Sequence, residues 1–262
     1  MPNTALWENY EQFGHHRGRM ICYILSQMLP LKGAHILDFG CGTGGISIEL
    51  DKWGARLTAV DTNPKKLAHL RNQIKPPSGI HIDNALPTVT AYFDAIILLD
   101  VIEHIEAPIA LLRQLCSMLK QNGFLYISTP NKYSPLHIFS DPHFSLPGVA
   151  LMSRRQVRYI TSTVLHWQDK KRRDFPQLFS LRRLNKILYK SGFDWSFLNR
   201  QVVQYGLEQP QAIWNRNSHL RIYDLLKRLH LLPLLQKSIT DQIDVFNRWL
   251  NPTWYLVAKK KQ

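Results

Sequence analysis

Apolar residues alternate along the first half of the chain between two patterns. Short runs rich in Ile, Leu, Val and Ala predict buried strands at Ala34–Phe39, Arg56–Val60, Gly79–Ile82, Phe93–Leu99 and Phe124–Ser128. Apolar residues three or four positions apart predict helices between them at Gly44–Trp53, Pro64–Ile74 and Pro108–Lys120. Strands that alternate with helices in this way predict an α/β fold with a doubly wound, parallel sheet.

The stretch Ile36–Gly45, ILDFGCGTGG, ends an apolar strand in a glycine-rich turn. This turn satisfies both G-x-G-x-G and G-x-G-x-x-G, and it lets the backbone approach a ligand closely. Asp61 follows about twenty residues later, at the end of the next strand, where an acid can accept both ribose hydroxyls of a bound nucleoside. No Gly-Lys-Ser/Thr run is present, which excludes a P-loop.

Asp38 separates the two remaining interpretations of the glycine turn. It stands two residues before the first glycine, where its carboxylate would repel the pyrophosphate of a dinucleotide. The same carboxylate would attract the ammonium and sulfonium groups of S-adenosylmethionine. The residues therefore favour S-adenosylmethionine as cofactor, and a dehydrogenase or a nucleotide-free α/β domain is the alternative.

On these residues the chain resembles the class I S-adenosylmethionine-dependent methyltransferases, and its motifs are nearest to the ubiquinone-type O-methyltransferases. Segments in the family's order are ILDFGCGTGG, LTAVDTNPKKL, HIDNALP, FDAIILLDVIEHI and LKQNGFLYISTPN, followed in outline by LFSLRRLNKILYKSGF and PTWYLVAKK. The resemblance implies a Rossmann-like, seven-stranded, mostly parallel sheet with a final antiparallel strand and helical insertions. It also implies cofactor-binding residues, namely Asp38, Gly40, Cys41, Gly42 and Gly44 at the methionine end, Asp61 and Thr62 at the ribose, Asp83 or Asn84 at the adenine, and Leu99.

The run Asp100-Val101-Ile102-Glu103-His104 follows the fourth predicted strand. It resembles an acid-x-x-Glu-His run that some ubiquinone-type O-methyltransferases and small-RNA 2′-O-methyltransferases use to hold a divalent metal. The resemblance thus implies a metal site, with Mg²⁺ as candidate, formed by Asp100, Glu103 and His104, where the cation would lower the pKa of an attacking hydroxyl. The alternative is a metal-free site in which His104 is the catalytic base and Glu103 shapes the pocket. His143, and with it His137, is a second candidate base or a fourth ligand, against the alternative of a surface histidine without a role.

Three segments lie outside the common scaffold of the single domain expected over 1–262. Residues 1–30 are expected to form a helical cap, 132–176 a lid over the pocket, and 206–250 a helical insertion before the last strand. Within the insertion, residues 220–237 place leucines at helical spacing among basic side chains. This pattern predicts a helix that packs on its neighbour or lies on a membrane or a lipid-linked acceptor.

The second part of the chain carries the whole net charge of +14. Residues 1–150 contain 12 basic and 12 acidic side chains, whereas residues 151–262 contain 21 and 7. Such a basic half favours an anionic partner, and a solvated surface is the alternative. Nucleic acid is the second candidate partner, on the basic clusters Arg154-Arg155, Lys170–Arg173 and Arg182-Arg183, but no recognised RNA-binding motif accompanies them.

Composition and cysteine content bear on where the protein works. The chain is 45% hydrophobic, and its three cysteines show neither disulfide nor metal-ligand spacing, which favours a reducing cytoplasm. We expect no membrane-spanning helix and no export signal. The sequence therefore predicts a cytoplasmic methyltransferase acting on an oxygen of a small or lipid-linked acceptor, with peripheral membrane contact through 220–237. An RNA-directed methyltransferase, or an RNA-binding module on a degenerate methyltransferase fold, is the alternative.

Overall fold

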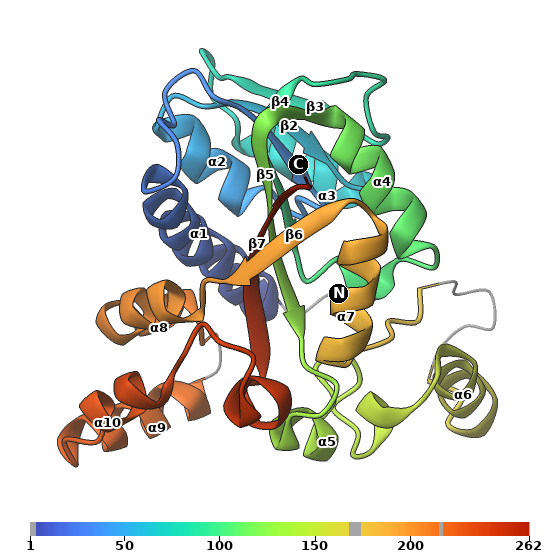
Figure 1. The fold of residues 1–262 in the computed structure, drawn as a ribbon, viewed down its shortest axis with the longest axis vertical. Helices are drawn as coiled ribbons and strands as arrows, with labels where there is room; N and C mark the ends of the chain where they lie inside the picture. The colour runs from blue at the N-terminus through green and yellow to red at the C-terminus, as the bar shows by residue number, and fades with distance from the viewer. Residues whose placement is uncertain (1–3, 168–173, 215–216, 262) are drawn as a thin grey trace.

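A computed structural model describes residues 4–167, 174–214 and 217–261 (Figure 1). Residues 168–173 of the expected lid, which include the basic cluster at 170–173, lie outside the described residues, as do residues 215–216 of the insertion. Among the described helices, none combines the length and the apolar character needed to cross a bilayer.

A seven-stranded sheet forms the centre of the molecule, as predicted. Its strands are β1 (His35–Phe39), β2 (Arg56–Val60), β3 (Ile80–Asp83), β4 (Phe93–Leu99), β5 (Leu119–Pro130), β6 (Phe193–Phe197) and β7 (Thr253–Lys260). The order across the sheet is β3-β2-β1-β4-β5-β7-β6. Neighbours from β3 to β5 pair in parallel, whereas β7 runs antiparallel to both β5 and β6. The predicted fold class is confirmed.

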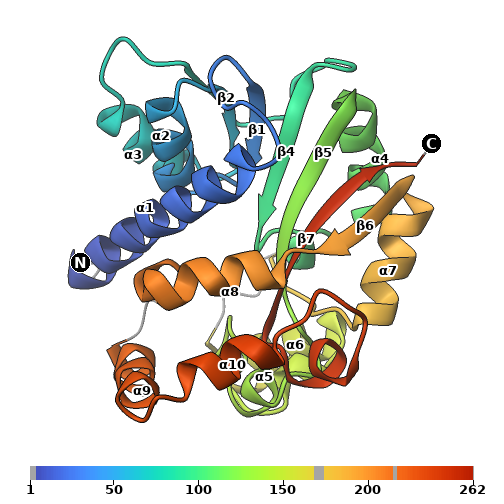
Figure 2. The same cartoon turned by 60° about the vertical axis from the view of Figure 1, so that its left-hand side comes forward.

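Helices cover both faces of this sheet. The longer ones are α1 (Thr4–Ser26), α2 (Gly45–Lys52), α3 (Pro64–Gln73), α4 (Pro108–Met118), α7 (Leu181–Lys190), α8 (Asn199–Glu208) and α9 (Asn217–Arg228). The shorter ones are α5 (Pro135–Phe139), α6 (Arg154–Tyr159) and α10 (Leu232–Ser238), with single turns η1 (Ile102–His104), η2 (Val149–Leu151), η3 (Ile160–Val164), η4 (Pro210–Ala212) and η5 (Phe246–Leu250). Figure 2 shows α1 and α2 on one side of the strands, and α4 and α7 on the other.

The strands are apolar on both faces because each face packs under helices. In β1, Ile36 belongs to the core beneath α1 and α2, and its neighbour Leu37 belongs to the core beneath α4 and α7. Alternate residues of β4 divide in the same way between the two cores. This two-sided burial explains why the strands read as continuous apolar runs.

The boundary between α4 and β5 differs from the predicted one. The apolar pattern placed a helix through Lys120 and a strand from Phe124, but the helix ends at Met118 and β5 begins at Leu119. Leu119 pairs with Phe93 at the start of β4, and the register between the strands then shifts before Ala95 pairs with Phe124. The Asn122-Gly123 pair therefore lies within an irregular strand rather than at the end of a helix.

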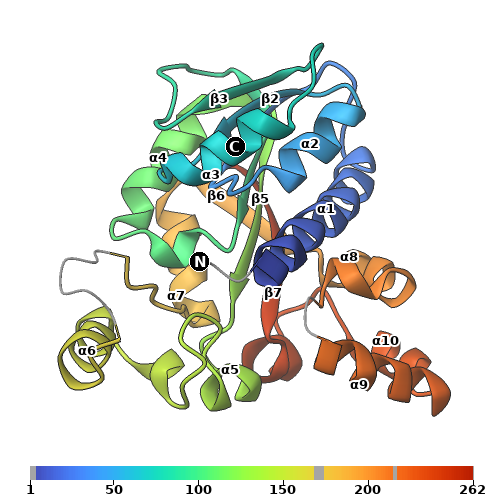
Figure 3. The same ribbon diagram turned by 180° about the vertical axis from the view of Figure 1, so that it is seen from behind.

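Helix α1 crosses the start of α2 with almost no space between the two backbones. A Cβ atom built on Gly45 would lie 2.6 Å from the carbonyl carbon of Gly14 and 2.8 Å from the backbone nitrogen of His15. This contact fixes α1, within the expected N-terminal cap, over the glycine turn (Figure 3). Gly45 is thus required by packing in addition to any role in ligand binding.

We expect Gly45→Ala to lower the free energy of unfolding by about 1–3 kcal/mol, because the added methyl group overlaps the α1 backbone. Gly14→Ala is the matched control: its Cβ would lie 3.6 Å from the Cα of Gly45, an ordinary contact, and alanine favours a helix interior. Urea denaturation of both variants measures the difference. Equal stability of the two would show that the helices separate at no cost.

Candidate active site

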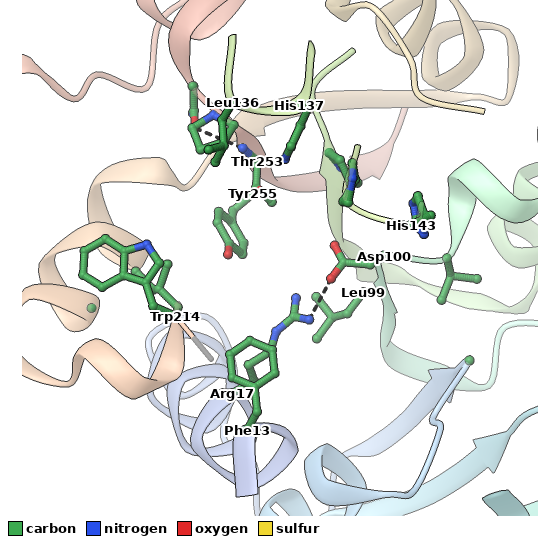
Figure 4. A pocket seen from close by; sticks show the side chains of 18 of the residues that line it. Phe13, Arg17, Leu99, Asp100, Leu136, His137, His143, Trp214, Thr253 and Tyr255 are labelled. Carbon is green, nitrogen blue, oxygen red and sulfur yellow. Dashed lines mark hydrogen bonds and ion pairs between the residues drawn. The ribbon is translucent and has the colours of Figure 1, made fainter. Parts of the chain in front are cut away.

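A cavity of about 1330 Å³ opens at the carboxyl ends of the parallel strands. Residues from α1, from the ends of β1, β2 and β4, and from both predicted insertions line it (Figure 4). Ligand pockets usually measure roughly 300–1,000 Å³. This cavity therefore has room for a cofactor together with a second molecule.

The glycine turn between β1 and α2 needs glycine for both conformation and space. Gly40 and Gly44 have backbone φ angles of 81° and 85°, which residues other than glycine rarely adopt. A Cβ on Gly40 would lie 2.4 Å from a methyl carbon of Val101, and one on Gly44 would lie 2.1 Å from a methyl carbon of Leu70. The turn thus stays bare, and its backbone borders the cavity at Gly40.

Asp38 is a buried carboxylate directly behind this turn. Only 2% of its surface is exposed, and its Oδ2 accepts a hydrogen bond of 2.6 Å from the Ser47 hydroxyl. Burial raises the pKa of Asp38 to about 6, in spite of the bond from Ser47, and the nearby charge of Asp61 adds to the rise. A carboxylate held in this way is poised to gain from a cationic ligand.

Asp61, at the end of β2, supports the turn and also faces the cavity. Its Oδ2 accepts the backbone N–H of Gly42 at 3.0 Å, and its Oδ1 accepts the N–H of Asn63 at 2.8 Å. Each carboxylate oxygen has a second lone pair, so Asp61 can still accept two ribose hydroxyls. Thr62 lines the cavity beside it.

The predicted cofactor residues occupy three kinds of position. Those that line the cavity are Gly40, Asp61, Thr62 and Leu99. Those that build the turn behind its wall are Asp38, Cys41, Gly42 and Gly44. Asp83 and Asn84 end the edge strand β3, where Asp83 pairs with Val60 and its Oδ1 accepts the backbone N–H of Asn84.

His104 and His143 line the cavity, and Glu103 is buried beside them. One possible ligand atom from each of the three residues lies within 4.8 Å of the others. Glu103 Oε1 and His143 Nε2 are 3.9 Å apart, and both are buried without a hydrogen bond in the described part of the chain. The Thr129 hydroxyl donates to the other oxygen of Glu103 at 3.0 Å. The two imidazole rings meet edge to face at 4.9 Å.

Burial controls the charge of this group. It raises the pKa of Glu103, and the nearby charge of Asp100 raises it further. Burial also lowers the pKa of His143, and the neighbouring His104 contributes to the decrease. Both shifts favour the neutral forms of these two side chains.

The structure does not bring Asp100 into this group. Its Oδ2 accepts a hydrogen bond of 2.7 Å from the Arg17 guanidinium, and its Oδ1 accepts one of 2.7 Å from the Ser128 hydroxyl. Burial alone would raise the pKa of Asp100, but Arg17 and Ser128 outweigh burial and hold it below its usual value. His143, rather than Asp100, therefore completes the set with Glu103 and His104.

Arg17 and Asp174 are site residues that the sequence interpretation missed. Arg17 reaches the cavity from α1, one turn after Phe13, and Figure 4 shows it pointing at Asp100. Asp174 lies 2.7 Å from His104 Nδ1, so it orients the imidazole ring. The spacing of Phe13 and Arg17 on one helical face was a signal that Arg17 faces the site. No local sequence feature marks Asp174.

The described part of the predicted lid is tied to the site by hydrogen bonds. The Arg154 guanidinium, from the start of α6, donates to the carbonyl oxygens of Glu103 at 2.9 Å and Ile105 at 3.1 Å. His137 lines the cavity too, but it is buried with Nδ1 donating to the Asn131 carbonyl at 3.1 Å. His137 is thus held by the backbone, whereas His143 and His104 face each other.

A glycine turn after β1, an acid after β2 and an antiparallel β7 between β5 and β6 define a class I methyltransferase fold. A model of the methyltransferase domain family matches residues 13–195, more than half of the chain. The chain therefore belongs to this family.

Individual relatives are similar to the chain in sequence, and solved structures are similar to it in fold. A ubiquinone biosynthesis O-methyltransferase of Xylella fastidiosa is 36% identical over 117 residues, which are 41% of this chain and 46% of that protein. The chain thus spans about half the length of the curated relatives it matches. A solved S-adenosylmethionine-dependent methyltransferase from Mesorhizobium loti covers 90% of this chain and 96% of its own, with a TM-score of 0.56 and 17% identity. A phosphoethanolamine N-methyltransferase from Haemonchus contortus, solved with S-adenosyl-L-methionine, covers 88% of this chain and 49% of its own at a TM-score of 0.51 and 17% identity.

The buried Asp38 predicts a pH-dependent loss of stability. Its pKa is about 6 in the folded chain, above the value of about 3.9 for an unfolded aspartate. Its contribution to stability is therefore complete below about pH 4 and is lost as the pH rises through 6. We expect Asp38→Asn to be more stable than wild type by about 1–3 kcal/mol at pH 7.5 and equally stable near pH 4. Urea denaturation across this range tests the expectation, and parallel curves for the two proteins would contradict it.

Proposed function

We propose that this protein transfers a methyl group from S-adenosylmethionine to an oxygen of a small or lipid-linked acceptor. The observation that carries the proposal is a pair of carboxylates at the glycine turn: Asp38 is buried directly before it, and Asp61 accepts the backbone N–H of Gly42 within it. A cation and a ribose satisfy these carboxylates, whereas a pyrophosphate would be repelled by Asp38. The O-methyltransferase relatives support oxygen as the acceptor atom.

In this proposal the cofactor spans the turn. Asp38 would attract its ammonium group, Asp61 would accept hydrogen bonds from its ribose hydroxyls, and the end of β3 would border its adenine. Its methyl group would then be available to an acceptor bound beside Asp100 and the histidines. Orientation in a closed site supplies most of the acceleration, because methyl transfer needs an in-line approach of the two reacting atoms.

His104 is the proposed base for the acceptor hydroxyl. Asp174 holds its Nδ1 at 2.7 Å, which leaves Nε2 to accept a proton and stabilises the imidazolium that results. His143 is a second acceptor nearby, because burial lowers its pKa and so favours the neutral imidazole. Deprotonation by either ring makes the acceptor oxygen a stronger nucleophile as it attacks the methyl carbon.

Glu103, His104 and His143 also fit a divalent cation. Glu103 Oε1 and His143 Nε2 are buried atoms that could ligate a metal, and neither has a hydrogen-bond partner in the described chain. A cation held there would lower the pKa of an acceptor hydroxyl. Two imidazoles and one carboxylate suit Mn²⁺ or Zn²⁺ better than Mg²⁺, which prefers oxygen ligands. The proposed ligand set omits Asp100 and includes His143, which the sequence offered as a candidate fourth ligand.

We expect S-adenosylhomocysteine to bind, and Asp61→Ala to weaken binding by about 1–3 kcal/mol. The variant loses the ribose acceptor together with the bonds that Asp61 accepts from Gly42 and Asn63. Asp61→Asn is the matched control, because it keeps one acceptor oxygen and should lose less. Calorimetry measures all three proteins. If wild type gave no heat of binding with S-adenosylhomocysteine but bound NAD, the proposal would be wrong and the protein would be a dehydrogenase.

We expect Mn²⁺ to bind to the protein, and Mg²⁺ to bind more weakly by roughly tenfold or more, because nitrogen ligands favour the softer ion. His143→Ala should reduce Mn²⁺ affinity by a similar factor, whereas Asp100→Asn should leave it nearly unchanged. Calorimetric titration needs no acceptor and decides the matter. Absence of Mn²⁺ binding would leave the His104-Asp174 pair as the proton acceptor of a metal-free site.

A further inference from the structure

Large apolar side chains are exposed at the end of the molecule where the cavity lies. Figures 1 and 3 show α5, α9, α10 and the turn η5 together beyond the carboxyl ends of β4 and β5. Each of these elements contributes at least one apolar side chain that is more than half exposed. We call the exposed apolar side chains of these elements the apolar rim: Leu136 and Phe139 of α5, Ile222 and Leu225 of α9, Leu229 just after α9, Leu234 of α10, and Val245, Trp249 and Leu250 at η5.

Helix α9 divides its apolar residues between the cavity and the solvent. Tyr223 and Leu226 line the cavity, one turn apart. Leu225 and Leu229 lie one turn apart on another face and are 55% and 56% exposed. Ile222 belongs to both sets, because it lines the cavity and is itself 56% exposed. The apolar residues of this segment therefore lie partly against the cavity and partly in solvent.

The rim is continuous with the cavity. Leu136 and Ile222, which line the cavity from α5 and α9, are both more than half exposed and so mark its mouth. Inside, the same part of the cavity has apolar walls formed by Val203, Leu207, Ile213, Trp214 and Leu226. A long apolar chain would be desolvated along this whole route.

Basic side chains accompany the exposed leucines. Helix α9 carries Arg221, Lys227 and Arg228 against one acid, Asp224, and all four are exposed. Apolar residues beside cations on one helix match an anionic lipid surface, where each basic residue contributes about 1 kcal/mol. A second copy of the chain meeting the same face would place these cations opposite one another, which is unfavourable.

We propose that the apolar rim docks on an anionic lipid bilayer and that the acceptor is an amphiphile that enters the cavity from this bilayer. The proposal rests on the proposed function for the acceptor, but membrane docking can be tested without cofactor or acceptor. Leucine and tryptophan side chains of the rim enter the interfacial region, and Lys227 and Arg228 contact lipid phosphates. The acceptor's apolar chain then lies between Trp214 and Leu226 while its hydroxyl reaches the histidines.

Sedimentation with vesicles of phosphatidylcholine, with or without phosphatidylglycerol, tests the docking. We expect wild type to sediment with the anionic vesicles and much less with the neutral ones. Lys227→Gln/Arg228→Gln should weaken binding to the anionic vesicles by about thirtyfold, from the loss of two charges near the surface. Leu225→Ser/Leu229→Ser should weaken it by at least roughly tenfold, because two exposed leucines no longer insert.

Matched controls place the effect on the rim. Lys186→Gln/Lys190→Gln removes two exposed charges from α7, and this variant should bind vesicles as wild type does. The Leu225 and Leu229 positions do not line the cavity, so the double serine variant should keep wild-type affinity for S-adenosylhomocysteine. Loss of vesicle binding with intact cofactor binding supports docking, and failure of cofactor binding in wild type would instead contradict the proposed function.

Three results would overturn the docking proposal. One is equal sedimentation with neutral and anionic vesicles, or none with either. Another is a wild-type dimer by light scattering that the Leu225→Ser/Leu229→Ser variant converts to a monomer, which would assign the rim to self-association. The third is RNA binding in a gel shift that the Lys227→Gln/Arg228→Gln variant loses while vesicle binding is absent.

Discussion

The site depends on the pairing of Asp100 with Arg17. Asp100 lines the cavity with its side chain 36% exposed, and two further acids, Asp38 and Glu103, are buried behind the cavity wall. Acids so close together are unfavourable unless some of their charge is removed. Arg17 compensates Asp100 at 2.7 Å, and Glu103 is driven toward its neutral form in part by the remaining field of Asp100. Asp38 keeps a raised pKa and thus a preference for a cation. The pKa of Asp100 is thus lowered by Arg17, whereas burial raises the pKa values of Glu103 and Asp38.

This pairing in turn depends on how α1 packs. Arg17 comes from a helix at the start of the chain, and Asp100 from the end of β4, where its φ angle is 54°. The close contact of Gly45 with Gly14 sets the position of α1 a single turn before Arg17. Packing between two glycines thus positions a charge at the cavity. The contact between α1 and α2 explains why Arg17, which is far from the glycine turn in sequence, belongs to the same site.

The sequence predicted the parts of this site that are local. The strand pattern and the glycine turn are encoded in consecutive residues, so the sheet and the positions of Asp38 and Asp61 followed from them. His143 was already a candidate ligand in the sequence. The pairing of Asp100 with Arg17 and of His104 with Asp174 was not predictable, because each joins residues distant in sequence. The early start of β5 at Leu119 was missed for a related reason, since its pairing with Phe93 overrides a helical pattern.

Helix α9 shows the limit of periodicity in a different way. The leucines of 220–237 predicted either a packed helix or a membrane-facing one. The segment forms two helices, α9 and α10, and the apolar residues of α9 are partly packed and partly exposed. Its Tyr223 and Leu226 face the cavity, while Leu225 and Leu229 face solvent, so an apolar stripe broader than one face leaves a remainder that the fold does not bury. Burial of that remainder requires something outside the chain. The basic residues on the same helix favour an anionic surface as that partner, and the cavity behind the stripe then becomes accessible from it.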